Sequence, residues 1–437
     1  MTNTGDAASL ADLMAARHAF KMHAQDGLCF EDVPLHAIAD AHGTPTWVYG
    51  AGSMAAQYSA LMAAFRAANV SAHVHYAVKA NDHLAVLDIF RQLGAGADVV
   101  SGGELARARH AGIAAADIVF SGVGKSATEI GTALAEGVGQ INVESAEELV
   151  MISGIASAMG TVAPVALRMN PDVDAGTHEK ITTGVAGNKF GLAQADIPGL
   201  YARARLLPGV RPVGIALHIG SQILSTAPYR AAYAKATAMV IALRAAGESV
   251  AVLDLGGGLG IGYGDEPGLS LSAFAQTINH ATSGLGVKLL VEPGRYLVGA
   301  AGLLLASVIL QKHDQGKRFV VLDAAMNDLI RPALYEAWHG IMPLSPVDYR
   351  AGLSPADVVG PVCESADRFA ADRLLPALVP GARVAILDAG AYGAVMSSHY
   401  NARPRGAAIM ISGGRFHLIT PRQDIAALWA DEQRLPG

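Results

Sequence analysis

The order of apolar and polar positions predicts that strands and helices alternate through most of the chain. From His73 onward, short apolar runs typical of buried strands are separated by longer segments with helical periodicity. This alternation is typical of β–α units built around a parallel sheet. The expected strands are His73–Val78, Ala97–Val100, Ile118–Phe120, Gln140–Val143, Pro164–Met169, Val213–Leu217, Val250–Leu255 and Lys288–Val291.

Eight such units in succession favour a closed (β/α)8 barrel of the TIM type. An open, doubly wound sheet would have the same periodicity, so the pattern alone does not decide between the two. Helix boundaries support the division into units. Ser126 with Glu129 and Ser145 with Glu148 both have the spacing of a capping box, and Gly137 is placed to end the first of these two helices.

The pattern changes after Leu303, where short strand candidates are separated by Gly, Pro and Asp. The last third of the chain is therefore expected to form a mostly β domain, with a final helix at Gln423–Gln433. At the other end, a helix is expected over Leu10–Ala24. Further expected elements are the strands Leu28–Phe30, Thr46–Tyr49, Leu304–Gln311, Arg318–Leu322, Ala382–Asp388, Ala407–Ile411 and Gly414–Ile419, and the helix Leu35–Ala41.

Composition narrows the class of protein. A chain of 437 residues is expected to form two domains, and 51% apolar against 16% charged residues suits a large interior or an oligomer interface. A net charge of -6 gives no basic surface for nucleic acid. The longest apolar run, Leu297–Leu310, is too short for a membrane helix, and no signal-peptide pattern opens the chain. Only Cys29 and Cys363 are present, which fits the reducing cytoplasm.

Lys79 lies in the run VHYAVKAND, at or just past the end of a predicted strand. A buried ammonium is costly, so such a lysine tends to lose its proton or to find a partner. A neutral buried amine is what Schiff-base chemistry requires. A lysine that reaches solvent from the strand end is the structural alternative for this stretch.

Other predicted strands also end in polar residues or glycine. In a βα barrel these strand ends share one face, where active sites are built. An amine, an imidazole, a glycine loop and carboxylates are therefore expected around one cavity. The strand-end residues are Lys79, Asp98, Ser101, Ser121, Glu144, Arg168, His218, Ser221, Gly256–Gly258, Glu292 and Arg295.

The glycine run Gly256–Gly258 follows the seventh predicted strand, where barrel enzymes often bind phosphate through backbone N–H groups. A plain tight turn is the structural alternative. A Rossmann site is disfavoured because the glycines are not in G-x-G-x-x-G register. The sequence Gly124–Ser126 resembles the end of a nucleotide-binding P-loop, but Val119 occupies the position of its first glycine, which disfavours an NTPase.

Two strand-end residues suit a flat heterocyclic ligand. His218 is followed by Gly220 and Ser221, so its imidazole could pack against a ring, although a satisfied core histidine is the usual fate of such a residue. Glu292, in the sequence VEPGR, could accept a hydrogen bond from a protonated ring nitrogen. An ion pair with Arg295 would explain the same spacing.

These residues lie in motifs that resemble the pyridoxal-phosphate decarboxylases of the alanine racemase-like barrel fold. The resemblance extends from about Gly27 to the C-terminus. Within this family it is greatest to the members that act on diaminopimelate. The motifs are YAVKAN, GADVVSGGEL, RMNPDVDAGTH, NKFG, HIGSQI, DLGGGLG, EPGR, DAAMNDLIRPALY, GPVCES and GAYGA.

The resemblance implies a domain organisation and an assembly. It implies a pyridoxal phosphate-binding (β/α)8 barrel at residues 46–304 and a β domain formed by residues 27–45 together with residues 305–437. It also implies pyridoxal 5'-phosphate as cofactor, an amino acid as substrate, and a homodimer whose active sites take residues from both chains. No metal site is expected.

The resemblance also implies roles for individual residues. Lys79 would bond covalently to the cofactor, and Cys363 would donate a proton from the partner subunit; outside this context, an isolated thiol is more often buried and inert. The expected cofactor-binding residues are Lys79, Asp98, Arg168, His218, Ser221, Gly256, Gly257, Gly258, Glu292, Gly294, Arg295 and Tyr392. The expected substrate-binding residues are Arg295, Arg331, Tyr335, Glu364 and Tyr392, in keeping with the affinity of arginine for carboxylates and of glutamate for ammonium groups.

The reaction implied is decarboxylation of meso-2,6-diaminopimelate to L-lysine and CO2, the last step of lysine biosynthesis. Decarboxylation of another diamino acid, such as ornithine, lysine or a D-enantiomer, is the alternative. The chain departs from the family pattern at Leu224–Ser225, after HIGSQI, and at Asp388–Ala389, before GAYGA. The GPVCES segment disfavours a racemase. Lys79, Glu292 and Cys363 together disfavour an inactive relative that binds a partner protein.

Overall fold

The computed structural model describes residues 10–176, 183–184, 187–264 and 266–435, so the end of the RMNPDVDAGTH motif lies outside the described residues. The chain divides into two compact units. The barrel unit comprises Ala55–Ile261 and Pro267–Leu297. The β unit comprises the chain before Ala55, the segment Gly262–Glu266 and the chain from Val298 onward.

The barrel unit contains a closed ring of eight parallel strands, as predicted. The ring strands are β5 (Ala72–Ala77), β6 (Gly96–Val99), β7 (Ile118–Phe120), β8 (Gln140–Val143), β9 (Ala163–Asn170), β11 (Val210–Ala216), β12 (Val252–Asp254) and β13 (Lys288–Val291), and the short β10 (Leu192–Ala193) pairs with β9. Pairing of β8 with β9 and of β13 with β5 closes the ring, which excludes the open sheet.

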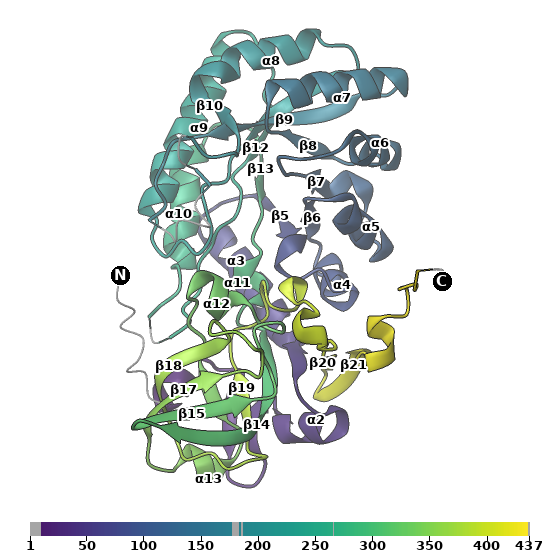
Figure 1. Ribbon diagram of the computed structural model, residues 1–437. Helices are drawn as coiled ribbons and strands as arrows, with labels where there is room; N and C mark the ends of the chain where they lie inside the picture. Colours follow the sequence, from purple (N-terminus) through teal and green to yellow (C-terminus); the bar gives the residue numbers. More distant parts are fainter. Residues whose placement is uncertain (1–9, 177–182, 185–186, 265, 436–437) are drawn as a thin grey trace. The chain divides into compact units, whose positions relative to one another are not determined.

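Helices surround the barrel strands. They are α3 (Ala51–Ala67), α4 (Leu84–Gln92), α5 (Gly102–His110), α6 (Ala127–Glu136), α7 (Ala146–Ala158), α8 (Ile197–Leu206), α9 (Ala227–Ala245), α10 (Leu271–Thr282) and the short α11 (Arg295–Val298). Helices α9 and α10 lie side by side on the outside (Figure 1). Among the helices of the described residues, none combines the length and the apolar character needed to cross a membrane.

The helix caps follow the predictions with one difference. Ser126 and Glu129 form a complete capping box at the start of α6. At α7, Ser145 accepts from the Glu148 N–H group as predicted. The Glu148 carboxylate, however, accepts from the Glu144 N–H group at 2.6 Å, because it is turned toward the end of β8.

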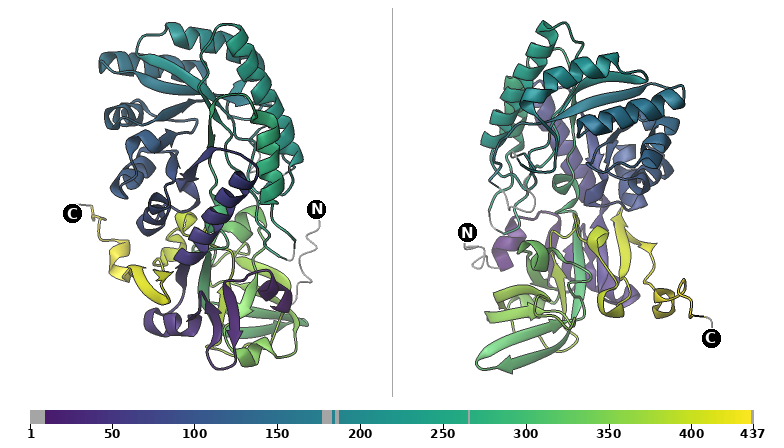
Figure 2. Two further views of the ribbon diagram at one scale, coloured as in Figure 1. Left: turned by 180° about the vertical axis from the view of Figure 1, so that it is seen from behind. Right: turned by 45° about the horizontal axis from the view of Figure 1, so that its top comes forward.

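The β unit is built on a sheet to which both ends of the chain contribute. Strand β4 (Thr46–Gly50) lies between β14 (Gly302–Asp314) and β20 (Ala407–Ser412), so the purple N-terminal segment runs among green and yellow strands in Figure 2. The remaining elements are the strands β1 (Phe20–His23), β2 (Gly27–Phe30), β3 (Val33–Pro34), β15 (Lys317–Leu322), β16 (Ile341–Pro343), β17 (Ser354–Val359), β18 (Arg368–Leu375), β19 (Arg383–Ile386) and β21 (Arg415–Thr420), and the helices α1 (Leu10–Ala15), α2 (Leu35–His42), α12 (Arg331–Tyr335) and α13 (Pro346–Tyr349).

Two of the predicted helices are wrong. The helix predicted over Leu10–Ala24 ends at Ala15, because Phe20–His23 pairs with β2 as strand β1. In place of the helix predicted at Gln423–Gln433, only the short 3-10 turn Ile425–Leu428 forms. The large apolar side chains Ile425 and Trp429 of this segment are exposed, so no packed face stabilises a longer helix. The sequence pattern also does not predict β16, which is only three residues long, or β17 and β18, whose apolar runs are interrupted by polar residues.

A buried ion pair in the β unit involves Asp388, one of the two residues before GAYGA at which the chain departs from the family pattern. The Arg17 guanidinium donates to Asp388 Oδ2 from Nε at 3.0 Å and from Nη2 at 2.5 Å. Nη2 also donates to the Tyr263 carbonyl oxygen at 2.5 Å. Burial raises the pKa of Asp388, and the charge of Arg17 opposes this rise. Arg17 is thus the counter-ion of a carboxylate that is only 1% exposed.

We expect Arg17→Met to lower the free energy of unfolding by about 3–5 kcal/mol at neutral pH, because the Asp388 carboxylate stays buried without its counter-ion. A carboxyl group with a raised folded-state pKa lowers the free energy of unfolding only where it is ionised. The loss of stability is therefore largest above that pKa and becomes smaller as the pH falls through it. Denaturant unfolding across this pH range measures the effect. The double variant Arg17→Met with Asp388→Asn is expected to recover part of the loss, and an equal deficit at every pH would contradict the explanation.

Candidate active site

Lys79 lies in a 3-10 turn, Val78–Ala80, directly after β5, at the strand end where it is predicted. Its Nζ is 2.6 Å from Oδ2 of Asp98, in β6. The Asp98 side chain is fully buried, whereas that of Lys79 is 33% exposed. The amine therefore has the partner that its position requires and still reaches open space.

A cavity of about 390 Å³ lies at the carboxyl ends of the barrel strands. Four predicted site residues line it, namely Lys79, Arg168, His218 and Glu292. Ser121, Asn142 and Phe190 also line the cavity. The structure thus brings together residues that are far apart in the sequence, as the barrel prediction requires.

His218 follows β11 and presents a neutral ring to the cavity. The Gly257 N–H group donates to its Nδ1 at 3.3 Å, so Nδ1 is an acceptor and the ring proton is on Nε2. Burial, followed by the charges of Lys79 and Arg168, lowers the pKa of His218 well below its usual value. An uncharged, flat ring at this wall suits packing against an aromatic ligand.

Glu292 follows β13, where its N–H group donates to the Gly256 carbonyl oxygen at 2.7 Å. Its side chain is buried, and within the described part of the chain Oε1 has no hydrogen-bond partner. Burial, followed by the charges of Asp254 and Asp98, raises the pKa of Glu292 well above its usual value. A buried carboxyl oxygen without a protein partner indicates a place for a ligand donor.

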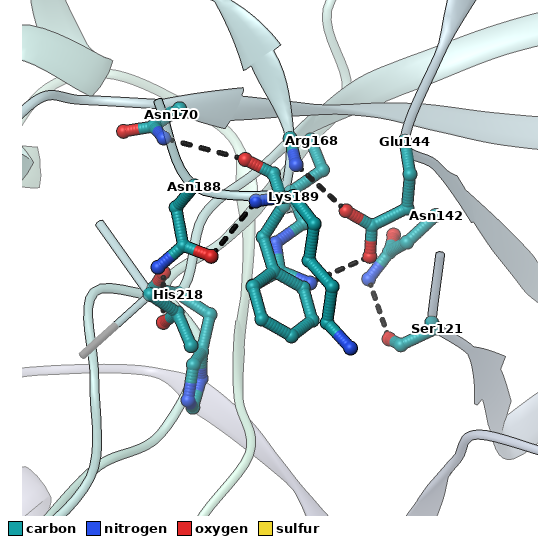
Figure 3. A network of polar contacts seen from close by, with 12 residues as sticks. Ser121, Asn142, Glu144, Arg168, Asn170, Asn188, Lys189 and His218 are labelled. Carbon is teal, nitrogen blue, oxygen red and sulfur yellow. Dashed lines mark hydrogen bonds and ion pairs between the residues drawn. The ribbon is translucent and has the colours of Figure 1, made fainter. Parts of the chain in front are cut away.

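Arg168, at the cavity wall, is held by a carboxylate and an aromatic ring. Its Nη1 is 2.5 Å from Oε1 of Glu144, and Oε2 of Glu144 accepts from the Gly191 N–H group at 2.8 Å. The guanidinium lies 5.0 Å from the centre of the Phe190 ring. Figure 3 shows the Arg168–Glu144 pair beside Asn142 and Ser121, with His218 on the other side of the view.

The glycine loop allows close approach of its backbone. A Cβ atom at position 257 would lie 2.0 Å from the Glu292 carbonyl oxygen, and Gly256 and Gly258 have φ values of 67° and 92°. The Gly256 N–H group donates to Asp254 Oδ1 at 3.0 Å, and that of Gly257 donates to His218. Two of the three N–H groups therefore bind protein acceptors, which the phosphate-loop prediction does not anticipate.

Two other predicted cofactor residues contact one another. Arg295 Nη2 donates to Ser221 Oγ at 3.1 Å. Gly294 lies close to the turn that carries Lys79, since a Cβ atom there would be 3.0 Å from the Ala80 Cβ atom. Neither Ser221 nor Arg295 is among the described residues that line the cavity.

Comparison with known proteins identifies the family. The family model of the pyridoxal-dependent decarboxylase, pyridoxal binding domain, matches residues 52–299. The diaminopimelate decarboxylase of Zymomonas mobilis is 46% identical over 412 residues, which cover 93% of this chain and 97% of that protein. The chain belongs to the diaminopimelate decarboxylase family.

Solved structures of the family agree with this assignment. The diaminopimelate decarboxylase of Helicobacter pylori, complexed with L-lysine, has a TM-score of 0.87 and 39% identity, covering 91% of this chain and 98% of that one. The enzyme of M. jannaschii, in complex with L-lysine, has a TM-score of 0.91 and 33% identity, covering 96% and 98%.

Pyridoxal phosphate, the cofactor of this family, fits the residues of the barrel cavity. The Oε1 atom of Glu292, which has no partner among the described residues, can pair with the ring nitrogen. The neutral ring of His218 can pack against the pyridine, and the Lys79 amine lines the same cavity. The glycine loop adjoins His218 and has no side chains to hinder a phosphate.

The β unit carries the remaining predicted residues, and two of them share helix α12. Arg331 and Tyr335 begin and end this helix, so their four-residue spacing places both side chains on one face, as predicted. The Arg331 guanidinium is 4.8 Å from the centre of the Tyr263 ring and 2.8 Å from His339 Nε2. Arg331 is buried, so it is not the surface arginine of the alternative interpretation.

The other three predicted residues of the β unit lie in loops. Cys363 and Glu364 are exposed between β17 and β18, and the Cys363 N–H group donates to Asn401 Oδ1 at 3.0 Å. A hydrogen bond with Glu364 raises the pKa of the Tyr400 hydroxyl. Tyr392 has a φ of 55°, a strained conformation for a non-glycine residue that is often found at functional sites.

Sequence reasoning missed Asn142 and Phe190 as cavity residues. A signal for Asn142 was present, because Gln140 and Asn142 alternate as polar residues in a strand of a closed barrel, and such side chains must find partners inside. Phe190 belongs to the NKFG motif, but its contact with Arg168 depends on a long loop whose path no periodicity specifies.

Proposed function

We propose that this chain is a pyridoxal phosphate-dependent decarboxylase that converts meso-2,6-diaminopimelate to L-lysine and CO2, the last step of lysine biosynthesis. The observation that carries the proposal is the convergence of Lys79, His218 and Glu292 on one barrel cavity, in a chain that matches its relatives over nearly their full length. Two relatives of known structure are described with L-lysine, the product of this reaction.

In the proposal, the barrel unit holds the cofactor. Lys79 bonds to it through Nζ, His218 packs against its ring and Glu292 binds the ring nitrogen. The phosphate group is expected near Gly258, since the N–H groups of Gly256 and Gly257 are engaged, with Ser221 and Arg295 as further ligands. The other proposed cofactor residues are Asp98, Arg168, Gly294 and Tyr392. When bound, pyridoxal phosphate supplies the electron sink that makes loss of CO2 feasible.

The substrate is proposed to be bound by Arg295, Arg331, Tyr335, Glu364 and Tyr392. An arginine fork matches a carboxylate, and a glutamate accepts from an ammonium group, so a substrate that ends in both groups is favoured over ornithine or lysine. Cys363 is proposed to return a proton from Sγ to the substrate carbon that has lost CO2.

We also propose that the protein is a cytoplasmic homodimer with shared active sites. Cys363 is exposed in the single chain, whereas a residue that delivers a proton to carbon works best where water is excluded. A partner subunit that covers Cys363 would provide this exclusion. Two cysteines outside any disulfide suit the reducing cytoplasm.

A substrate panel tests the proposed function. CO2 release is measured with meso-diaminopimelate, L- and D-lysine and L- and D-ornithine, each with and without added pyridoxal phosphate. We expect cofactor-dependent turnover of meso-diaminopimelate and formation of L-lysine. Faster turnover of ornithine or lysine would reject the substrate, and the absence of any cofactor absorbance would reject the enzyme class.

Arg331→Met is expected to raise KM for meso-diaminopimelate about 10- to 100-fold, because a charge-assisted hydrogen bond to a carboxylate contributes roughly 1.5–3 kcal/mol. Steady-state kinetics measure the effect on KM. The absorption spectrum of the cofactor measures the effect on cofactor binding and is expected to stay unchanged. The matched control is Arg350→Met, which removes an exposed arginine of the same unit. An unchanged KM for Arg331→Met would remove this residue from the substrate site.

A further inference from the structure

A second carboxyl group, that of Asp254, lies next to Glu292 inside the barrel. Strands β12 and β13 are parallel neighbours, with Asp254 opposite Leu290. Since side chains alternate along a strand, Glu292 follows on the same face, two residues closer to the cavity. The two carboxyl groups share a hydrogen bond, and both side chains are buried.

The two members of this pair have different partners. Asp254 Oδ1 accepts from the Gly256 N–H group at 3.0 Å, and Oδ2 accepts from Asn142 Nδ2 at 3.2 Å and from Gln140 Nε2 at 3.4 Å. Three N–H donors favour the ionised form of Asp254. Oε1 of Glu292 has no donor among the described residues. When two such groups share one site, one of them keeps a proton, and this asymmetry places that proton on Glu292.

The other charged groups around Glu292 act in opposite directions. Asp98, on β6, favours the protonated form of Glu292, whereas Lys79, after β5, favours the ionised form. Lys79 lies 2.6 Å from Asp98, so these two charges largely offset one another. His218 is neutral. Together with burial, the charge of Asp254 therefore favours a proton on Glu292.

We propose that Asp254 is a positioning residue that keeps one proton on Glu292 in the cofactor-free protein, and that Glu292 passes this proton to the cofactor's ring nitrogen on binding. The O–H bond of Glu292 breaks and an N–H bond forms on the ring, so the carboxyl pair gains one negative charge and the ring gains one positive charge. No proton is needed from solvent. The inference rests on the cofactor site of the proposed function and adds the source of the ring proton.

The test is the number of protons exchanged with the buffer when pyridoxal phosphate binds. This number is obtained by calorimetry at one pH in buffers of different ionisation enthalpy, for the wild type and for Asp254→Asn. The variant lacks the charge that, after burial, contributes most to the raised pKa of Glu292, so more of its Glu292 is ionised before binding. We expect it to take up more protons per site than the wild type, by at most one. Equal proton numbers would overturn the proposal.

Gln140→Met is the matched control. It removes a donor to Asp254 and to Asn142 but keeps both carboxyl groups, so its proton number is expected to equal that of the wild type. A change in proton number as large in Gln140→Met as in Asp254→Asn would indicate that disrupted hydrogen bonds, and not the lost charge, cause the change. This result would overturn the proposal.

Infrared spectroscopy keeps the test valid if Asp254→Asn does not fold. The cofactor-free wild type is expected to have the C=O stretching band of a protonated carboxylic acid, which disappears on cofactor binding and is missing in Glu292→Gln. The absence of this band in the wild type would overturn the proposal. Failure of the proposed function is distinguishable, because it would leave the wild type without cofactor absorbance or turnover.

Discussion

Lys79→Ala is expected to lower turnover by at least ~10³-fold and to remove the absorption band of the covalently bound cofactor, because we propose this residue as both the attachment point and an amine that can move protons. Among the described residues that line the cavity, Lys79 is the only lysine. The nearby Lys125 cannot replace it, since its amine is fully buried and bound to Glu148 and two backbone carbonyl groups. CO2 release and the visible spectrum measure both effects.

Lys79→Arg separates the covalent role from the ion pair with Asp98. Arginine keeps the positive charge next to Asp98, but it stays protonated and does not form the covalent bond. We therefore expect Lys79→Arg to fold at least as stably as Lys79→Ala and to be equally inactive. Normal activity in either variant would refute the assignment of Lys79.

Cys363→Ala is expected to lower kcat about 10²- to 10⁴-fold, the usual contribution of a positioned proton donor, while the cofactor absorbance stays unchanged. Since Cys363 is exposed in the single chain, its removal leaves no cavity in the core. Rapid-mixing kinetics and the spectrum of the purified variant provide the measurement. Loss of bound cofactor instead of slower turnover would point to a structural thiol.

Mixing the two inactive variants tests whether the active sites are shared. If Lys79 and Cys363 of one site come from different subunits, a hybrid dimer of Lys79→Ala and Cys363→Ala chains has one site with both substitutions and one intact site. Random pairing then restores roughly a quarter of the wild-type activity. No recovery after verified exchange of subunits would place both residues of a site in the same chain.

The parts of the fold that depend on local sequence were predictable. The barrel strands are continuous apolar runs between well-marked helix ends, such as Ser126 with Glu129, so their number and order follow from the pattern. The carboxyl ends of these strands must meet at one face, which is why Lys79, His218 and Glu292 could be grouped by their positions in the sequence. Closure itself depends on the pairing of β13 with β5, which periodicity does not report.

The parts that depend on contacts between distant segments were not predictable. The hydrogen bond between Asn142 and Asp254 joins two strands far apart in the chain, and the pair of Arg17 with Asp388 joins its two ends. The helix predicted at Gln423–Gln433 has helix-forming residues but no surface to cover, so local propensity did not decide its structure. The roles of the residues in the β unit came from family resemblance rather than from spacing.

The position of β4 between β14 and β20 has a consequence for synthesis of the protein. Strand β4 leaves the ribosome long before either of its neighbours, so both of its edges lack partners while the barrel segment is being made. Unpaired strand edges are templates for aggregation. A message cut short before β20 would leave one edge of β4 permanently open, so such products are candidates for chaperone capture and degradation rather than for partial activity.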